Sequence, residues 1–202
     1  MRLIERPKGW LTQAGAVMND LAGAGYLLGA LFITFDVVAR RLFGFTSRGT
    51  VEISGYLYAF GLTWALTHTL VTRGHIRVDF LVMRLLLRVR AYLHLAAVGF
   101  LCGFTIVLTW RAWDVVLQSW LLRARDTSAL SIPLALPQGL WAVGLTVFAM
   151  TTVSVLLETL ALLLKRDHVA VDRMLSSPTM EQETKAVLEA SGAEPPAVST
   201  PI

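Results

Sequence analysis

The chain has 202 residues, of which 55% are hydrophobic, and its mean hydropathy is +0.60. This composition is too apolar for an ordinary soluble domain of this length and indicates a membrane protein. The formal net charge of +4 does not indicate nucleic-acid binding, because the basic residues are divided among several segments between apolar ones. We therefore expect membrane lipids, and no nucleic acid, among the partners of this protein.

Four apolar segments are long enough to cross a bilayer, whose hydrocarbon core is about 30 Å thick and requires roughly 20 residues of helix. They cover residues 16–38, 53–71, 92–117 and 138–164. Helices are expected because lipid offers no hydrogen-bonding partner to an unpaired backbone group. The predicted fold is an all-α membrane protein with four transmembrane helices. A cytoplasmic arm of residues 1–15 precedes them, and a cytoplasmic, largely disordered tail of residues 165–202 follows.

The first apolar segment could be a signal peptide, since Arg2, Arg6 and Lys8 precede it as in a charged leader. It is longer than the apolar region of a typical signal peptide, however. It also runs into Arg40 and Arg41 without a small-residue cleavage site. We interpret it as a retained transmembrane helix.

Lys and Arg are unevenly distributed over the two sides of the predicted helix bundle. One side carries the larger number, namely Arg2, Arg6, Lys8, Arg73, Arg77, Arg84, Arg88, Arg90, Lys165, Arg166, Arg173 and Lys185. The other side carries Arg40, Arg41, Arg48, Arg123 and Arg125. Because Lys and Arg are enriched on the cytoplasmic side of membrane proteins, both termini are predicted to be cytoplasmic.

A dense polar cluster separates the second and third apolar segments, where residues 73–79 have the sequence R-G-H-I-R-V-D. Arg77 of this cluster shares one side of a helix with Arg84 and Arg88, which follow it, and apolar residues cover the opposite side. This pattern predicts an amphipathic helix over residues 79–90 that lies in the cytoplasmic interface of the membrane. The alternative is that these residues extend the third transmembrane helix, which would place three arginines in lipid.

Ionisable residues inside transmembrane helices are candidates for functional sites. Arg111 and Asp114 are three residues apart near the end of the third segment. We expect an ion pair on one helix face, at the membrane surface, beside an aromatic belt of Trp110, Trp113 and Trp120.

Two further carboxylates are candidates. Glu158 lies seven residues before Lys165, about 10 Å along a helix, and is the deepest charge in the sequence. It could relay protons, bind an ion or pair with an arginine of a partner subunit. We favour a structural role, because a single carboxylate makes a poor ion pathway. Glu52, at the start of the second segment, is predicted to cap that helix or to pair with Arg48 or Arg40.

The sequence offers little support for catalysis. It contains no nucleotide-binding, metalloprotease or hydrolase motif. Cys102 is the single cysteine, so a disulfide within the chain and a multi-cysteine metal site are excluded. Of the four histidines, only His68 lies clearly inside a predicted span, whereas a membrane di-haem centre needs facing pairs. We expect a protein that is not an enzyme and that binds no cofactor or metal.

Two pairs of glycines have the spacing that allows transmembrane helices to approach closely. They are Gly25 with Gly29, and Gly99 with Gly103. The close contact could lie within this bundle or against another protein.

Four short motifs, arranged in order around the apolar segments, carry a resemblance to a known family. They are F-D-V-V-A-R-R-L-F-G-F-T at residues 35–46, followed by Glu52; R-G-H-I-R-V-D at 73–79; S-A-L-S-I-P at 128–133; and P-Q-G-L-W-A-V-G at 137–144. Over about residues 21–164 the sequence resembles the small membrane subunit, DctQ-like, of the tripartite ATP-independent periplasmic (TRAP) transporters.

The resemblance implies a scaffold subunit in the inner membrane of a bacterium. Such a subunit pairs, as a heterodimer, with a large membrane subunit that carries the substrate and sodium sites. A periplasmic solute-binding protein delivers the substrate, commonly an organic acid, and an ion gradient, usually of sodium, drives uptake. On this basis Arg73, His75, Arg77 and Asp79 are expected to fix the cytoplasmic turn, with Asp79 as the N-cap of the interfacial helix. Alternatively, they contact the large subunit.

Two other functions remain open at this point. One is a haem-bearing or anchoring membrane subunit of a respiratory complex, which would require bound haem. The other is a stand-alone transporter or channel of four helices, in which Glu158 would have to serve as the membrane carboxylate. The position of Glu158 near the end of the last span fits that role poorly.

Overall fold

The computed structural model describes residues 9–45, 47, 49–72, 85–127 and 130–175. Five helices form in this part of the chain: α1 (Gly9–Phe43), α2 (Thr50–Val71), α4 (Leu87–Leu121), α5 (Ala135–Leu164) and α6 (His168–Leu175). The described residues contain no β-strand, only an isolated bridge between Arg125 and Pro133. The prediction of an all-α protein is confirmed.

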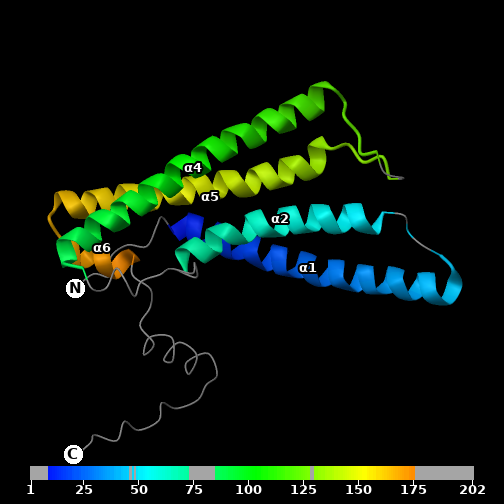
Figure 1. The fold of residues 1–202 in the computed structure, drawn as a ribbon, viewed down its shortest axis with the longest axis horizontal. Coiled ribbons are helices and arrows are strands. Elements are labelled where there is room, and N and C mark those ends of the chain that lie inside the picture. The colour runs from blue at the N-terminus through cyan, green and yellow to red at the C-terminus, as the bar shows by residue number, and fades with distance from the viewer. Residues whose placement is uncertain (1–8, 46, 48, 73–84, 128–129, 176–202) are drawn as a thin grey trace, which may run out of the picture.

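The long helices form two antiparallel hairpins (Figure 1). One hairpin consists of α1 and α2, the other of α4 and α5, and the two are joined mainly through contacts between α2 and α5. The hairpins are staggered, so the end of the α4–α5 hairpin that carries α6 extends past the neighbouring end of the α1–α2 hairpin (Figure 1). There α6 packs against α4 and α5.

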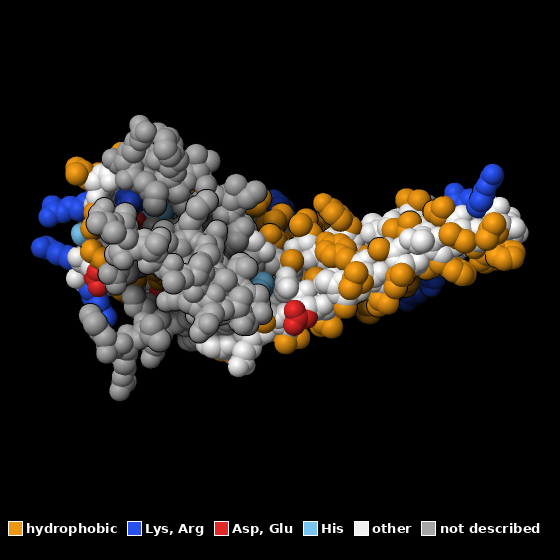
Figure 2. Space-filling view, turned by 90° about the horizontal axis from the view of Figure 1, so that it is seen from below, with side chains coloured by type: hydrophobic (Ala, Val, Ile, Leu, Met, Phe, Trp, Pro, Cys, Tyr) orange, Lys and Arg blue, Asp and Glu red, His pale blue; other side chains and the backbone are white. Residues whose placement is uncertain are grey.

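Three of the helices, α1, α4 and α5, are long and apolar enough to cross a membrane. The second predicted span corresponds to α2, which is not among these three, because Thr, Tyr, Gly, Glu52 and His68 interrupt its apolar residues. A fourth span therefore stays a prediction. Figure 2 shows apolar side chains along the elongated part of the molecule and Lys and Arg side chains mainly toward its ends.

The helices run further than the predicted spans. The first helix begins at Gly9, within the predicted arm of residues 1–15, and ends before Gly44. Gly44 has a φ of +66° and its N–H donates to the Arg40 carbonyl at 3.2 Å, which is a common helix end. The third span extends outward in the same way, since α4 includes residues on both sides of 92–117. Hydropathy predicts only the part of a spanning helix that lies in the lipid core. The helix itself continues beyond that part, until a residue that ends it, such as Gly44.

One boundary prediction is corrected. Leu85 and Leu86 are not helical, and residues 87–90 form the first turn of α4 rather than the end of an interfacial helix. The rest of that predicted helix lies outside the described residues. The tail of residues 165–202, predicted to be disordered beyond about Ser176, begins with α6, which packs on the bundle; residues 176–202 lie outside the description.

The two glycine pairs have different surroundings. A Cβ atom on Gly29 would lie 2.9 Å from Leu57 of α2, and one on Gly25 would lie 3.5 Å from Phe60. A Cβ atom on Gly99 or Gly103 would meet nothing within 4 Å. The first pair therefore serves close packing inside the α1–α2 hairpin, whereas the second faces outward from α4.

Candidate interaction sites at the two ends of the bundle

Asp36 organises the turn between α1 and α2. Its side chain is 2% exposed, and it accepts a hydrogen bond from the Ser47 backbone N–H at 2.7 Å and one from Arg40 Nη2 at 2.9 Å. The Ser47 and Thr50 hydroxyls are 2.7 Å apart and connect this turn to the start of α2. The carboxylate therefore ties the end of α1 to the following loop.

Asp36 was not among the site residues predicted from the sequence. The available signal was its position four residues before Arg40, a spacing that brings two side chains together on a helix. The contact with Ser47 had no comparable signal, because it joins residues on opposite sides of a turn.

Glu52 lies in the first turn of α2, where a carboxylate stabilises the positive end of the helix dipole. The helix begins after Gly49, and no side-chain hydrogen bond caps it, so the predicted cap by Glu52 is not present. Arg40 pairs with Asp36 instead of Glu52. Arg48, the other predicted partner, lies outside the described residues.

The connector between α4 and α5 docks on the same end of the bundle. The Tyr56 hydroxyl of α2 donates a hydrogen bond to Asp126 Oδ2 at 2.8 Å. The Leu130 side chain lies directly against Gly49, where it leaves no room for a Cβ atom. These contacts join the connector, which includes Leu130 of the motif at residues 128–133, to the start of α2.

Arg111 and Asp114 form the expected pair on α4. Arg111 Nη1 lies 3.5 Å from Asp114 Oδ2, and the guanidinium carbon lies 4.9 Å from the centre of the Trp110 ring. The Arg111 side chain is 68% exposed. An exposed pair of this kind contributes little to stability, so the arrangement is open to solvent, lipid headgroups or another protein.

At the opposite end of the bundle, α6 is held on α4 by a charged contact. Arg90 Nη2 of α4 lies 2.5 Å from Asp172 Oδ2 of α6, and His94 Nε2 lies 3.7 Å from Asp172 Oδ1. The Arg90 and Asp172 side chains are mostly buried. Asp167 accepts a hydrogen bond from the Ala170 N–H at 2.9 Å and so caps α6.

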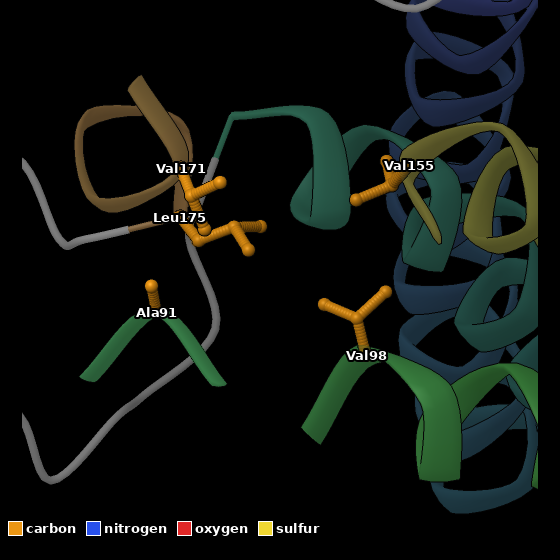
Figure 3. Packing of buried hydrophobic residues seen from close by; sticks show 5 residues of the cluster. All are labelled: Ala91, Val98, Val155, Val171 and Leu175. Carbon is orange, nitrogen blue, oxygen red and sulfur yellow. The ribbon is translucent and has the colours of Figure 1, made fainter. Parts of the chain in front are cut away.

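Apolar side chains also pack between α6 and the helices α4 and α5 (Figure 3). Ala91 of α4 points toward Leu175 of α6, and the Val171 and Leu175 side chains extend toward Val98 and Val155, which continue the cluster between α4 and α5. Sequence reasoning missed this contact because the stretch is short. The signal it carried was Val171 and Leu175 at a helical spacing of four residues.

Removing the Asp172 carboxylate is expected to release α6. Asp172→Ala leaves the mostly buried Arg90 guanidinium without its partner. Because α6 can detach alone, we expect the loss to be limited to its docking, about 2 kcal/mol. Hydrogen exchange of the α6 amides should become more than about tenfold faster. The charge-exchange variant, Arg90→Asp with Asp172→Arg, should recover part of the protection; unchanged exchange in Asp172→Ala would contradict the assignment.

The remaining candidates take no part in the contacts described above or lie outside the description. Glu158 is half-buried on α5, and no described residue forms an ion pair with it. The polar cluster of the cytoplasmic loop, Arg73, His75, Arg77 and Asp79, lies wholly outside the described residues. The described part of the chain holds no group of three His, Cys, Asp or Glu residues that could bind a metal. Cys102 is buried.

Comparison with known proteins gives one match. A family model described as "Tripartite ATP-independent periplasmic transporters, DctQ component" matches residues 29–165. No curated protein and no solved structure matches the chain. The matched range contains the turn at Asp36, the docked connector and the Arg111–Asp114 pair. The matched range ends before α6. The surface of α4 and α5 on which α6 packs therefore lies inside the match, whereas α6 itself lies outside it.

Proposed function

The chain belongs to the DctQ family, the small membrane component of tripartite ATP-independent periplasmic transporters, and from this membership we propose that it is a non-catalytic scaffold subunit. In this role it holds a large membrane subunit in place while that subunit carries out transport. The proposal is supported by one combination of features: side-chain hydrogen bonds join the helices inside the bundle, and apolar side chains cover much of its outer surface.

The interior is joined by side-chain hydrogen bonds between helices. Trp64 Nε1 of α2 donates to the Leu140 carbonyl of α5 at 2.9 Å. The Thr109 hydroxyl of α4 shares its proton between the Thr105 carbonyl of its own helix, at 2.7 Å, and the Leu145 carbonyl of α5, at 3.2 Å. The Thr105 and Thr152 hydroxyls, also from α4 and α5, are 3.1 Å apart. Such bonds between packed helices favour a single arrangement of the bundle, as a scaffold requires.

The exterior offers large apolar surfaces on the two outer helices. On α1 the Phe35 side chain is 66% exposed, and on α4 those of Phe100 and Phe104 are 80% and 65% exposed. Exposed apolar area of this extent is covered by lipid or by another membrane protein. A scaffold subunit needs both kinds of contact.

The finer parts of the proposal follow family membership. We propose that a periplasmic solute-binding protein delivers an organic acid, that a sodium gradient drives uptake, and that the small and large subunits form a heterodimer. We also propose that α2 is the fourth spanning helix and that both termini are cytoplasmic, in agreement with the distribution of Lys and Arg. Glu52, Glu158, the Arg111–Asp114 pair and the loop residues Arg73, His75, Arg77 and Asp79 are proposed as structural or interface residues.

Co-expression tests the proposal. The tagged chain is expressed with its genetic neighbours, extracted in mild detergent and purified, and the proteins that accompany it are identified by mass spectrometry. We expect one large, many-helix membrane protein in about equal amount. Sodium-dependent uptake of an organic acid should then require both membrane proteins and the binding protein in proteoliposomes. A monodisperse chain without such a partner, or one whose absorbance spectrum shows haem, would overturn the proposal.

A further inference from the structure

Three basic side chains are exposed and unpaired at the end of the bundle that carries α6. They are Arg88 in the first turn of α4, and Lys165 and Arg166, which directly follow α5. Among the residues that the structure describes, none forms a hydrogen bond or an ion pair with any of these three side chains. Figure 2 shows Lys and Arg side chains at this end of the molecule. We call Arg88, Lys165 and Arg166 the basic patch.

The two carboxylates of the neighbouring helix α6 and its first cap are already bound. Asp172 binds Arg90, and Asp167 accepts a hydrogen bond from the Ala170 N–H as the cap of α6. Neither carboxylate forms an ion pair with the basic patch. The positive charge of the patch is therefore left to attract an anion from outside the chain.

The basic patch borders one exposed aromatic side chain. Arg88 and Tyr92 are four residues apart and share one face of α4. The Tyr92 ring lies 6.1 Å from the ring of His168, at the start of α6. His168 closely follows Lys165 and Arg166 in the chain, so the turn that carries these two residues lies beside the Tyr92 face of α4. The Tyr92 side chain is 60% exposed.

The length of α4 places Arg88 at the level of lipid headgroups. Residues 95–110 contain no charged residue, and Tyr92 and Trp113 lie on either side of this run, about 32 Å apart along the helix. The hydrocarbon core of a bilayer is about 30 Å thick, and Tyr and Trp are enriched at its two surfaces. Arg88 lies one turn beyond Tyr92 and thus in the headgroup region.

A contact between α4 and α5 gives Lys165 the same level independently. Trp113 Nε1 donates a hydrogen bond to Thr146 Oγ1 at 3.0 Å, so Thr146 of α5 lies at the membrane surface marked by Trp113. Lys165 follows about 29 Å further along α5. Lys165 and Arg88 therefore reach the same, opposite surface of the membrane.

A strip of small residues leads from the basic patch toward the middle of the membrane. We define the α4 strip as the small residues that continue the Tyr92 face of α4: Ala96, Gly99 and Gly103. A Cβ atom on either glycine would meet nothing within 4 Å, and the exposed side chains of Phe100 and Phe104 border one side of the strip. From Tyr92 to Gly103 the distance along the helix is about 16 Å. This is about half the thickness of the hydrocarbon core, the depth of one leaflet.

We propose that the basic patch binds the headgroup of an anionic phospholipid and that one acyl chain of this lipid lies on the α4 strip. The headgroup compensates the unpaired cations at the membrane surface, and the small residues let the chain pack against the helix. A free anion matches the charge alone, whereas a lipid matches the charge, the level and the apolar strip below it. This contact does not depend on the proposed function, because it joins the chain to its membrane and not to another subunit.

Native mass spectrometry of the full-length chain in mild detergent tests the headgroup contact. The chain is mixed with equal amounts of phosphatidylglycerol and phosphatidylcholine that have the same acyl chains, and the bound lipids are counted. We expect the wild type to retain phosphatidylglycerol more than about fivefold over phosphatidylcholine, the contribution of a single basic residue at an anionic surface. A triple variant of the basic patch should lower the retained phosphatidylglycerol more than about tenfold: Arg88→Gln, Lys165→Gln and Arg166→Gln.

Two further triple variants separate the site from net charge. One keeps the charge of the patch and should retain most of the phosphatidylglycerol: Arg88→Lys, Lys165→Arg and Arg166→Lys. The other removes the same charge from exposed residues at the opposite end of the bundle and should change retention less than about twofold: Arg41→Gln, Arg123→Gln and Arg125→Gln. All of these positions are exposed, so the variants should elute as monodisperse protein.

Filling the α4 strip tests the acyl-chain contact without changing any charge. Gly99→Leu with Gly103→Leu places side chains where a Cβ atom meets nothing, and it should lower the retained phosphatidylglycerol more than about threefold by displacing the acyl chain. Gly139→Leu is the matched control, because this glycine of α5 is equally open. It should leave the retained lipid unchanged.

The outcomes that would overturn the proposal are distinct. Equal retention of the two lipids by the wild type would show that the headgroup charge is not recognised. Equal retention of phosphatidylglycerol by the wild type and the Gln variant of the patch would remove the patch, and equal losses in the Gln variants of the two ends would leave net charge as the explanation. Inorganic phosphate at the concentration of the lipid should displace no phosphatidylglycerol. Displacement by phosphate, with unchanged retention in the Gly99 and Gly103 variant, would assign the site to a free anion.

Discussion

Gly144→Leu is expected to separate the two hairpins. A Cβ atom at this position would lie 2.7 Å from both Thr63 Oγ1 and Trp64 Cδ1, so a leucine forces α5 away from α2. The displacement would also stretch the hydrogen bond from Trp64 Nε1 to the Leu140 carbonyl. We expect a loss of about 3 kcal/mol in the free energy of unfolding, the upper part of the usual range for overpacking. Thermal unfolding in mild detergent, followed by circular dichroism, measures this loss.

Gly139 provides a matched control on the same helix. A Cβ atom there would meet nothing within 4 Å, and alanine is a better helix former than glycine by about 1 kcal/mol. Gly139→Ala should therefore be neutral or stabilising, whereas Gly144→Ala should already destabilise. Equal effects of alanine at the two positions would show that α2 and α5 are not in close contact at Gly144.

Asp36→Ala is expected to loosen the turn between α1 and α2. The substitution leaves the Ser47 N–H without its acceptor and the Arg40 guanidinium without its carboxylate. Because the carboxylate is 2% exposed, water does not readily replace these bonds. We expect a loss of about 3 kcal/mol in the free energy of unfolding, measured by the same detergent assay.

Two variants separate the parts of this effect. Asp36→Asn keeps an oxygen that can accept from Ser47 but removes the charge that binds Arg40, so about half of the loss is expected. Asp114→Asn removes a carboxylate from an exposed pair and should cost less than about 1 kcal/mol. A loss in Asp36→Ala no larger than that in Asp114→Asn would contradict the role assigned to Asp36.

The candidate sites differ in how far the sequence could predict them. Arg111 and Asp114 were found because both partners lie on one helix, three residues apart, and the spacing alone brings them together. Tyr56 and Asp126 are 70 residues apart, and Arg90 and Asp172 are 82 apart. No local sequence pattern predicts such pairs, because they form only when particular helices pack next to each other.

The glycine pairs illustrate the same limit. Gly25 with Gly29 and Gly99 with Gly103 have equal spacing and similar apolar neighbours in the sequence. Only the packing shows that the first pair lies against α2 and that the second faces outward. The role of a small residue depends on which residues of another helix lie opposite it. The sequence around the small residue does not specify those residues.

The sequence by itself determined the membrane class, the all-helical fold, the family and three of the four predicted spans, which are long apolar helices in the structure. It could do so because hydropathy, helical spacing and short motifs are properties of consecutive residues. The tertiary structure decided how the turn at Asp36 is closed, where α6 docks and which glycines lie against a neighbouring helix. These features arise from contacts between segments distant in the chain, whose free energy depends on packing and desolvation in three dimensions rather than on local order.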